Sequence, residues 1–366
     1  MLKPQYRELA REAAVKSMVL LKNDKNKEGI ALLPLDKGVR LGIFGEAASN
    51  RGEMTGAWAI GAKADDCVSI EDACKARGVA YQIGTEAAVE EVAADCEVLL
   101  AVIGEKKDES GEAASRADIT LPKEQIVLLE KLLETGKPVA AVLFNGRPLA
   151  IPYVAEHVPA VLEAWHPGIE AGNAVLDVLF GDVNPSGKLT VTFPAASGQC
   201  PMYYAHMNTG RPGGKSKFTS KYLDAPVEPL YPFGYGLSYT EYEYSDLRVQ
   251  RVEDAYEIRV KVKNTGSMDG EEIVQCYVRD VAAGRVRPVK QLAAFEKTAL
   301  KSGEEKEVCF YINVDKLGYY NWSMDYVVEA GEFVFYAGGS SKDCLEVRVN
   351  HKQKEKEQTD GKSNDS

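Results

Sequence analysis

The feature that most restricts the possible folds is a change of hydrophobic pattern near residue 240. Before it, short apolar runs without alternation recur at residues 40–45, 97–104, 138–145 and 159–165. Such runs are typical of strands that are buried on both faces of a parallel sheet. After it, apolar and polar residues alternate with period two, which is typical of strands with one solvated face. The two patterns require different layer architectures, so we expect two domains, as a length of 366 residues allows.

Segments with helical character lie between the apolar runs of the first part. Residues 7–22 carry apolar side chains at helical spacing, which predicts a helix over that range. Residues 123–135 follow a proline and precede a glycine, which are typical start and stop signals of a helix. Strands that alternate with helices predict a three-layer α/β sandwich domain with a mostly parallel sheet, over residues 1–200.

The second part has the pattern of an all-β domain. The alternating runs are residues 255–264, 271–280, 289–300, 304–313 and 331–339, with turn-forming residues between them. This pattern predicts a fibronectin type III-like β-sandwich over residues 241–350. Residues 201–240 are predicted to form a long ordered linker. Residues 351–366 are polar and aperiodic, which predicts a disordered tail.

Charge and composition exclude several classes of function. The net charge of −11 is not offset by a basic patch, so no nucleic acid and no anionic membrane is expected as a partner. No apolar run is long enough for a transmembrane helix, and the charged N-terminal segment does not look like a signal peptide. The seven cysteines form no C-x-x-C pair, which favours reduced thiols and a cytoplasmic location. The four histidines are far apart, and no Cys/His spacing predicts a metal site.

One acidic segment directly follows the apolar run at residues 97–104. Its sequence, ESGEAASRADITLP (residues 109–122), holds Glu109 and Glu112, with Arg116 nearby. Ligands of open parallel sheets bind beyond the carboxyl ends of the strands. Cleavage of a glycosidic bond uses two carboxyl groups, one of them a proton donor whose pKa is raised by desolvation. The alternative is a loop that only contacts solvent, because surface glutamates are common.

Several long motifs occur in a fixed order along the chain. They include LEAWHPGIEAGNAVLDVLFGDVNPSGKLTVTFP at residues 162–194, PLYPFGYGLSYT at residues 229–240 and KNTGSMDGEEIVQCYV at residues 263–278. Together they resemble glycoside hydrolase family 3 of the bacterial β-glucosidase type, in its second (α/β sandwich) and third (fibronectin type III-like) domains. The resemblance implies a glycosidase of the retaining type that needs no cofactor and acts on a β-linked glucoside or oligosaccharide.

The resemblance also implies roles for individual residues. Glu112 of SGEAASR matches the general acid/base of the family, and Glu109 is the alternative if the loop register is shifted. Arg116 becomes the neighbouring positive charge, which orients the loop or contacts the sugar. Trp58, in EMTGAWAIGA, matches an aromatic residue that can line the leaving-group subsite. The alternative for Trp58 is a side chain packed in the core of the domain.

The family's first domain, a (β/α)8 barrel that supplies the aspartate nucleophile, has no counterpart in this sequence. The chain would then be a split or truncated product, an excised part, or the leading part of a permuted enzyme. We therefore expect the barrel to act in cis or in trans, and the isolated chain to be inactive. The rival hypothesis is a non-catalytic carbohydrate-binding or assembly module that docks on a separate barrel polypeptide. A nucleotide-binding α/β protein is disfavoured, because no glycine-rich phosphate loop is present.

Overall fold

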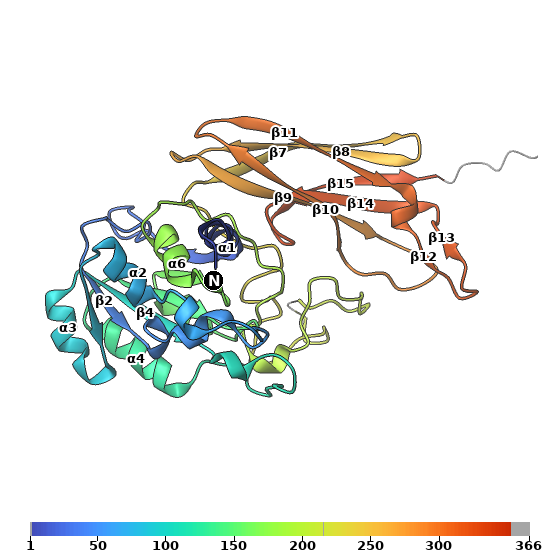
Figure 1. Cartoon of the computed structure of the whole chain (residues 1–366). Coiled ribbons are helices and arrows are strands. Elements are labelled where there is room, and N and C mark those ends of the chain that lie inside the picture. Colours follow the sequence, from blue (N-terminus) through green and yellow to red (C-terminus); the bar gives the residue numbers. More distant parts are fainter. Residues whose placement is uncertain (1, 215, 353–366) are drawn as a thin grey trace, which may run out of the picture.

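The computed structural model describes residues 2–214 and 216–352, and the predicted tail lies almost entirely outside them. The described residues form an α/β domain and a β-sandwich, joined by a long connection (Figure 1). Both predicted fold classes are confirmed. Among the described residues, none of the helices combines the length and the apolar character that crossing a membrane requires.

The α/β domain is built on one six-stranded sheet in the order β1-β6-β5-β4-β2-β3. Its strands are β1 (Val19–Asn23), β2 (Leu41–Phe44), β3 (Tyr81–Gly84), β4 (Val98–Gly104), β5 (Val139–Phe144) and β6 (Ala160–Glu163). The pairings among β2 to β6 are parallel, and β1 pairs antiparallel with β6. The sheet is therefore mostly parallel, as predicted.

Helices cover both faces of this sheet. They are α1 (Pro4–Ser17), α2 (Ile70–Arg77), α3 (Val89–Asp95), α4 (Lys123–Glu134), α5 (Pro152–His157) and α6 (Ala171–Leu179). In β4, Leu100 and Val102 pack in the core shared with α1, α2 and α6, whereas Leu99 and Ala101 pack in the core shared with α3, α4 and α5. Successive side chains of a strand point to opposite faces. A run that is buried on both faces must therefore be apolar throughout, which explains the uninterrupted hydrophobic pattern.

The predicted helix over residues 7–22 is wrong in its second part. Helix α1 ends at Ser17, and Val19–Asn23 form β1 at the edge of the sheet. Val19, Leu20 and Leu21 are all buried, so this segment is apolar on both faces like the other strands. Periodicity cannot separate such a run from the end of a buried helix, and its partner β6 lies far along the chain.

The order of the strands defines a switch point in the sheet. From β2 the chain moves to β3 on one side, and then returns to β4 on the other side of β2. The loops after β2 and after β4 therefore turn in opposite directions and leave a crevice at the carboxyl ends of these two strands. We call the edge of the sheet at these carboxyl ends the carboxyl edge.

The second domain consists of two packed antiparallel sheets. One has the order β10-β9-β14-β15 and the other the order β11-β8-β7, and a small hairpin forms from β12 and β13. The bounds are β7 (Tyr242–Val252), β8 (Ala255–Asn264), β9 (Gly270–Asp280), β10 (Gln291–Leu300), β11 (Glu305–Asn313), β12 (Tyr319–Tyr320), β13 (Tyr326–Val327), β14 (Gly331–Gly338) and β15 (Cys344–His351). The inward side chains of both sheets share one core. Strands β7 and β15 add to the five runs that the sequence predicted.

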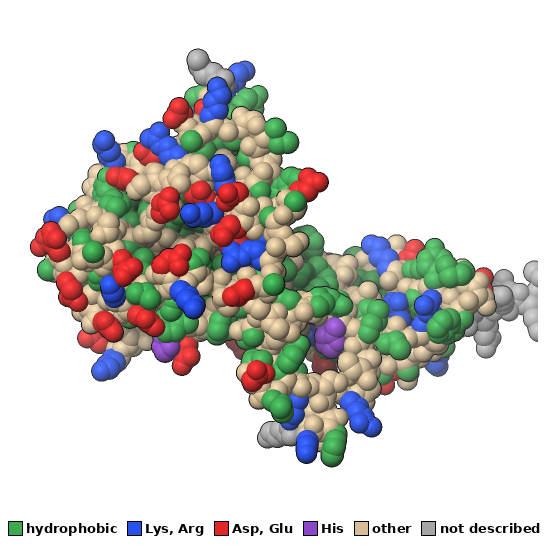
Figure 2. Space-filling model, turned by 90° about the horizontal axis from the view of Figure 1, so that it is seen from below, with side chains coloured by type: hydrophobic (Ala, Val, Ile, Leu, Met, Phe, Trp, Pro, Cys, Tyr) green, Lys and Arg blue, Asp and Glu red, His purple; other side chains and the backbone are tan. Residues whose placement is uncertain are grey.

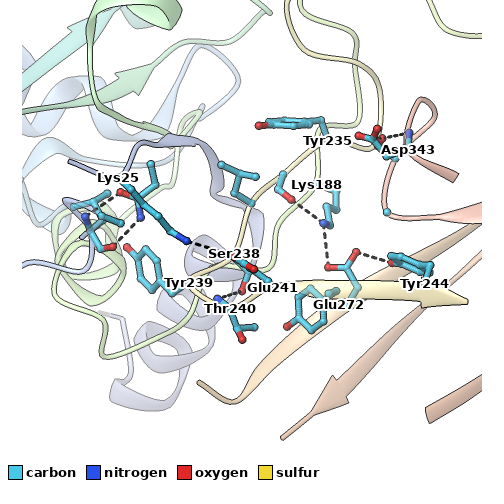
Figure 3. A pocket seen from close by; sticks show the side chains of 18 residues that line it. Lys25, Lys188, Tyr235, Ser238, Tyr239, Thr240, Glu241, Tyr244, Glu272 and Asp343 are labelled. Carbon is cyan, nitrogen blue, oxygen red and sulfur yellow. Dashed lines mark hydrogen bonds and ion pairs between the residues drawn. The ribbon is translucent and has the colours of Figure 1, made fainter. Parts of the chain in front are cut away.

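A buried ion pair fastens the sandwich to the α/β domain (Figure 3). Lys188 Nζ lies 3.1 Å from Glu272 Oε2 of β9 and donates to the Gly236 carbonyl at 2.8 Å. The Tyr244 hydroxyl donates to Glu272 Oε1 at 2.8 Å. Tyr239 donates to the Val178 carbonyl of α6 at 2.7 Å. These bonds cross between both domains and the last part of the connection, so the junction is a built contact.

The earlier part of the connection, residues 201–214 and 216–229, first contacts the sandwich, where the Val289 amide donates to the His206 carbonyl, and then projects outward (yellow-green in Figure 1). Viewed from below, it forms a lobe with green apolar side chains at the lower edge of the molecule (Figure 2). Tyr203, Phe218, Tyr222 and Leu223 of this segment are all exposed. Large apolar side chains gathered on one segment are a common sign of an interaction surface.

Candidate active site

Two segments that leave the sheet at the switch point lie against each other. The one after β2 contains a short 3-10 helix (Arg51–Thr55) and Trp58, and the one after β4 contains another (Lys107–Glu109) and Glu112. The Lys107 amide donates to Glu53 Oε2 at 2.6 Å. A Cβ atom on Gly111 would lie 3.0 Å from Ala57 Cβ and 3.5 Å from the Trp58 indole nitrogen. The structure therefore brings together two segments that the sequence singled out separately.

Glu112 is displayed at the top of a strained turn. It lies between Gly111 at φ +102° and Ala113 at φ +60°, and its side chain is exposed. A positive φ is uncommon for alanine, and such residues persist only where the surrounding structure holds them. Among the residues that the structure describes, no hydrogen bond or ion pair occupies the Glu112 carboxylate. We call residues 109–114 the Glu112 arch.

Glu109, the alternative acid, is used within the local structure. Its Oε2 accepts from the Lys106 amide at 2.9 Å. Its Oε1 lies 3.3 Å from Arg116 Nη1, which is also 3.6 Å from Glu105 Oε1. Arg116 therefore faces Glu105 and Glu109. Of the two candidate acids, Glu112 is therefore the one whose carboxylate is available to a ligand.

Trp58 is 69% exposed, so it is not packed in the core of the domain. The neighbouring Ile60 is also fully open to solvent. An exposed indole next to an exposed carboxylate suits an apolar ring face with a polar edge, which is the surface of a pyranose.

Glu105 and Arg147 lie beside the candidate site, although the sequence analysis assigned a role to neither. Glu105 follows β4 directly and its side chain is only 1% exposed, while Arg147 follows β5. Arg147 Nε lies 2.8 Å from Glu105 Oε1. Burial raises the pKa of Glu105, and the charges of Arg147 and Arg116 oppose that rise. A charged residue placed immediately after a buried strand was the available signal for Glu105.

A second buried group lies below these residues. The carboxyl of Glu163, at the end of β6, accepts from the Trp165 amide at 2.8 Å and from Asn145 Nδ2 at 3.1 Å. Burial raises the pKa of Glu163 to about 8. Burial also lowers the pKa of His166, and the neighbouring Glu53 opposes that shift. Buried groups with displaced pKa values concentrate at functional sites more often than elsewhere.

A cavity of about 600 Å³ opens at the ends of β2, β3 and β4. Glu46, Glu53 and Glu105 are among its lining residues, whereas Glu112 and Trp58 are not. The two displayed side chains therefore face solvent outside this cavity.

Comparison with known proteins identifies the family. Residues 18–239 match the glycosyl hydrolase family 3 C-terminal domain, and residues 272–341 match a fibronectin type III-like domain. The chain belongs to glycosyl hydrolase family 3. The predicted resemblance is thereby confirmed over both domains.

Two curated relatives from family 3 show the same degree of identity under different names. The periplasmic beta-glucosidase of Salmonella typhimurium is 38% identical and aligns with 92% of this chain and 49% of its own length. A beta-xylosidase of Formosa agariphila has the same identity and the same two coverages. The chain thus spans about half the length of the curated family 3 relatives that it matches.

A solved family 3 structure shares the fold over nearly the whole chain. The beta-glucosidase of Listeria innocua in complex with glucose superimposes with a TM-score of 0.91 at 37% identity. The match covers 96% of this chain and 50% of that protein. The order of the two domains is therefore shared with a glucose-binding member of the family.

Proposed function

We propose that this chain supplies the acid/base half of a retaining β-glycosidase of the β-glucosidase type. The observation that carries the proposal is the display of Glu112. Its carboxylate is exposed on a strained turn at the switch point of the sheet, beside an exposed tryptophan and outside the cavity at the ends of β2, β3 and β4. Such an arrangement fits half of a site that a second body completes.

The second body is a (β/α)8 barrel, either on the same polypeptide or on another. An aspartate of the barrel attacks the anomeric carbon while Glu112 donates its proton to the leaving glycosidic oxygen. Glu112, now ionised, then removes a proton from the water that hydrolyses the glycosyl-enzyme. Trp58 stacks on the leaving-group sugar, and Arg116 places a positive charge near the site. The 366-residue chain alone is expected to be inactive, because the nucleophile comes from the barrel.

The substrate class is a β-linked glucoside or oligosaccharide. The name and bound ligand of the Listeria innocua protein support glucose, while the equally similar beta-xylosidase shows that identity alone does not select the sugar. Xylose differs from glucose by lacking the hydroxymethyl group. The barrel therefore has to provide the contacts that separate the two.

The exposed apolar side chains support a docked barrel. Trp58 and Ile60 lie on the α/β domain, and Phe218 and Leu223 lie on the connection. Burial of such side chains is favourable by about 25 cal/mol for each Å² of apolar area removed from water. The same surface would serve a non-catalytic assembly module, so the exposed residues support a partner under either hypothesis.

The test is hydrolysis of 4-nitrophenyl β-glucoside by the chain alone and by the chain mixed with the barrel half of a family relative. We expect activity in the mixture only. Glu112→Gln should remove it, and azide should restore turnover by replacing the water that Glu112 activates. The matched control is Glu109→Gln, which leaves the displayed carboxylate in place. Activity of the chain alone would overturn the proposal. Binding of the barrel without hydrolysis would favour the assembly module.

A further inference from the structure

One guanidinium holds the Glu112 arch at two points. Arg147 Nη2 donates to the Ala114 carbonyl at 2.8 Å and also to the Glu109 carbonyl. These two carbonyl groups lie on either side of Glu112. The arch is therefore fixed at both of its ends by the same side chain, which comes from the turn after β5.

Arg147 is itself fixed by neighbouring groups. Its Nε lies 2.8 Å from the buried carboxylate of Glu105, and its own carbonyl accepts from Asn145 Nδ2 at 2.8 Å. The turn also has no spare room, since a Cβ atom on Gly146 would lie 2.2 Å from the Ser110 hydroxyl oxygen. Glu105 and Arg147 thus connect the Glu112 arch to the ends of β4 and β5.

We propose that Arg147 is the positioning residue of the acid/base, a role that rests on the proposed function of Glu112. The left-handed conformation of Ala113 is unfavourable in an isolated loop. Two carbonyl contacts to one planar guanidinium fix the spacing between Glu109 and Ala114 and so stabilise this turn. Glu112 is then presented before substrate or barrel arrives.

Arg116 cannot perform this task. It lies near the same two acids, Glu105 and Glu109, but its recorded backbone contact is to the Asp118 carbonyl, beyond the arch. A lysine at position 147 would keep the positive charge but lose the planar fork that reaches two carbonyl groups and a carboxylate together. Arg147→Lys is therefore the informative change.

The first test measures amide hydrogen exchange in the isolated chain. Arg147→Lys should make the amides of residues 109–114 exchange about 10-fold faster, because charge-assisted hydrogen bonds to the arch are lost. The matched control is Arg77→Lys on α2. Arg77 has the same 21% side-chain exposure and also contacts a backbone carbonyl, of Asn173, together with the carboxylates of Asp177 and Asp182. The control should leave exchange in the arch unchanged. Unchanged exchange in Arg147→Lys would overturn the inference whatever the activity.

The second test separates positioning from general stability in the mixture with a barrel. Aryl β-glucosides with poor leaving groups need the proton from Glu112, whereas 2,4-dinitrophenyl glucoside barely needs it. Arg147→Lys should therefore lower kcat about 10-fold or more for the poor leaving groups and much less for the good one. Equal losses for all leaving groups would overturn the positioning role. Hydrolysis that persists in Glu112→Gln would instead refute the proposed function, and the exchange result would still stand.

Discussion

The carboxyl edge and the domain junction both bury charged side chains, but they satisfy them differently. At the junction, Lys188, Glu272 and Tyr244 meet in a closed set of contacts. At the carboxyl edge, Glu105 faces both Arg147 and Arg116, and the buried Asn145 Oδ1 has no hydrogen-bond partner among the described residues. Unsatisfied buried polar atoms are rare in folded proteins and require an explanation. The closed contacts suit a structural role for the junction, and the less complete contacts fit the chemistry that we propose for the carboxyl edge.

The strongest test of this contrast is Glu112→Gln. Activity in the mixture with a barrel should fall by about 10²- to 10⁴-fold, since the general acid/base is removed. Stability should change by less than about 0.5 kcal/mol, because the side chain is exposed. Kinetics and urea denaturation of the same preparation measure both quantities. A large loss of stability would contradict the contrast, because it would mean that the Glu112 carboxylate stabilises the fold.

The converse test at the junction is Lys188→Met. It leaves the carboxylate of Glu272 buried without its cation, which should cost about 3–5 kcal/mol of unfolding free energy. The matched control is Lys25→Met, since Lys25 pairs with Glu241 at 3.2 Å in the same region but both side chains are exposed. Exposed pairs contribute about 0–1 kcal/mol. Similar urea midpoints for the two variants would refute the structural role of the buried pair.

The buried Glu163 should make the stability of the protein depend on pH. Burial raises its folded-state pKa to about 8, so the folded protein keeps a proton that the unfolded chain loses near its ordinary value of 4.5. Stability from this group is complete below that value and falls as pH rises towards 8, by about 1.4 kcal/mol for each pH unit. Glu163→Gln should lack this dependence. The Tm of Glu163→Gln minus the Tm of the unsubstituted chain should therefore increase from pH 5 to pH 8. A difference that stays constant would contradict the raised pKa of Glu163.

The smallest expected effect is that of Trp58→Ala. Stability should stay within about 0.5 kcal/mol, because the indole is exposed. The KM for an oligosaccharide should rise about 2- to 10-fold, which corresponds to the loss of one aromatic stacking contact. Trp322→Ala is the control, since this tryptophan is also exposed, at 80%, but lies on the sandwich. A change in KM for Trp322→Ala alone would instead indicate that the sugar contacts the second domain.

The sequence predicted those parts of the fold that depend on local pattern. Strands β4 and β5 were found because a strand buried on both faces is apolar throughout, and α4 because its ends carry clear signals. Strand β1 was mistaken for helix, since its identity depends on pairing with β6. The short edge strand β3 gave too little pattern to be recognised.

The site was predictable only in part for a similar reason. Glu112 and Trp58 stand in recognisable segments, and the structure displays both, while their roles remain predictions. Arg147 acts through carbonyl groups of residues more than thirty positions earlier in the chain. No local pattern encodes a contact with a backbone carbonyl, because every residue has one. Such a residue becomes visible only when the loops are assembled.

The buried pair between Lys188 and Glu272 also limits how modular this protein can be. Lys188 belongs to the segment that leaves the α/β domain, and its counter-ion belongs to the sandwich. If the chain were cut between the domains, Lys188 would lose its contact with Glu272. Evolution or engineering could therefore exchange the sandwich only together with the residues that receive it.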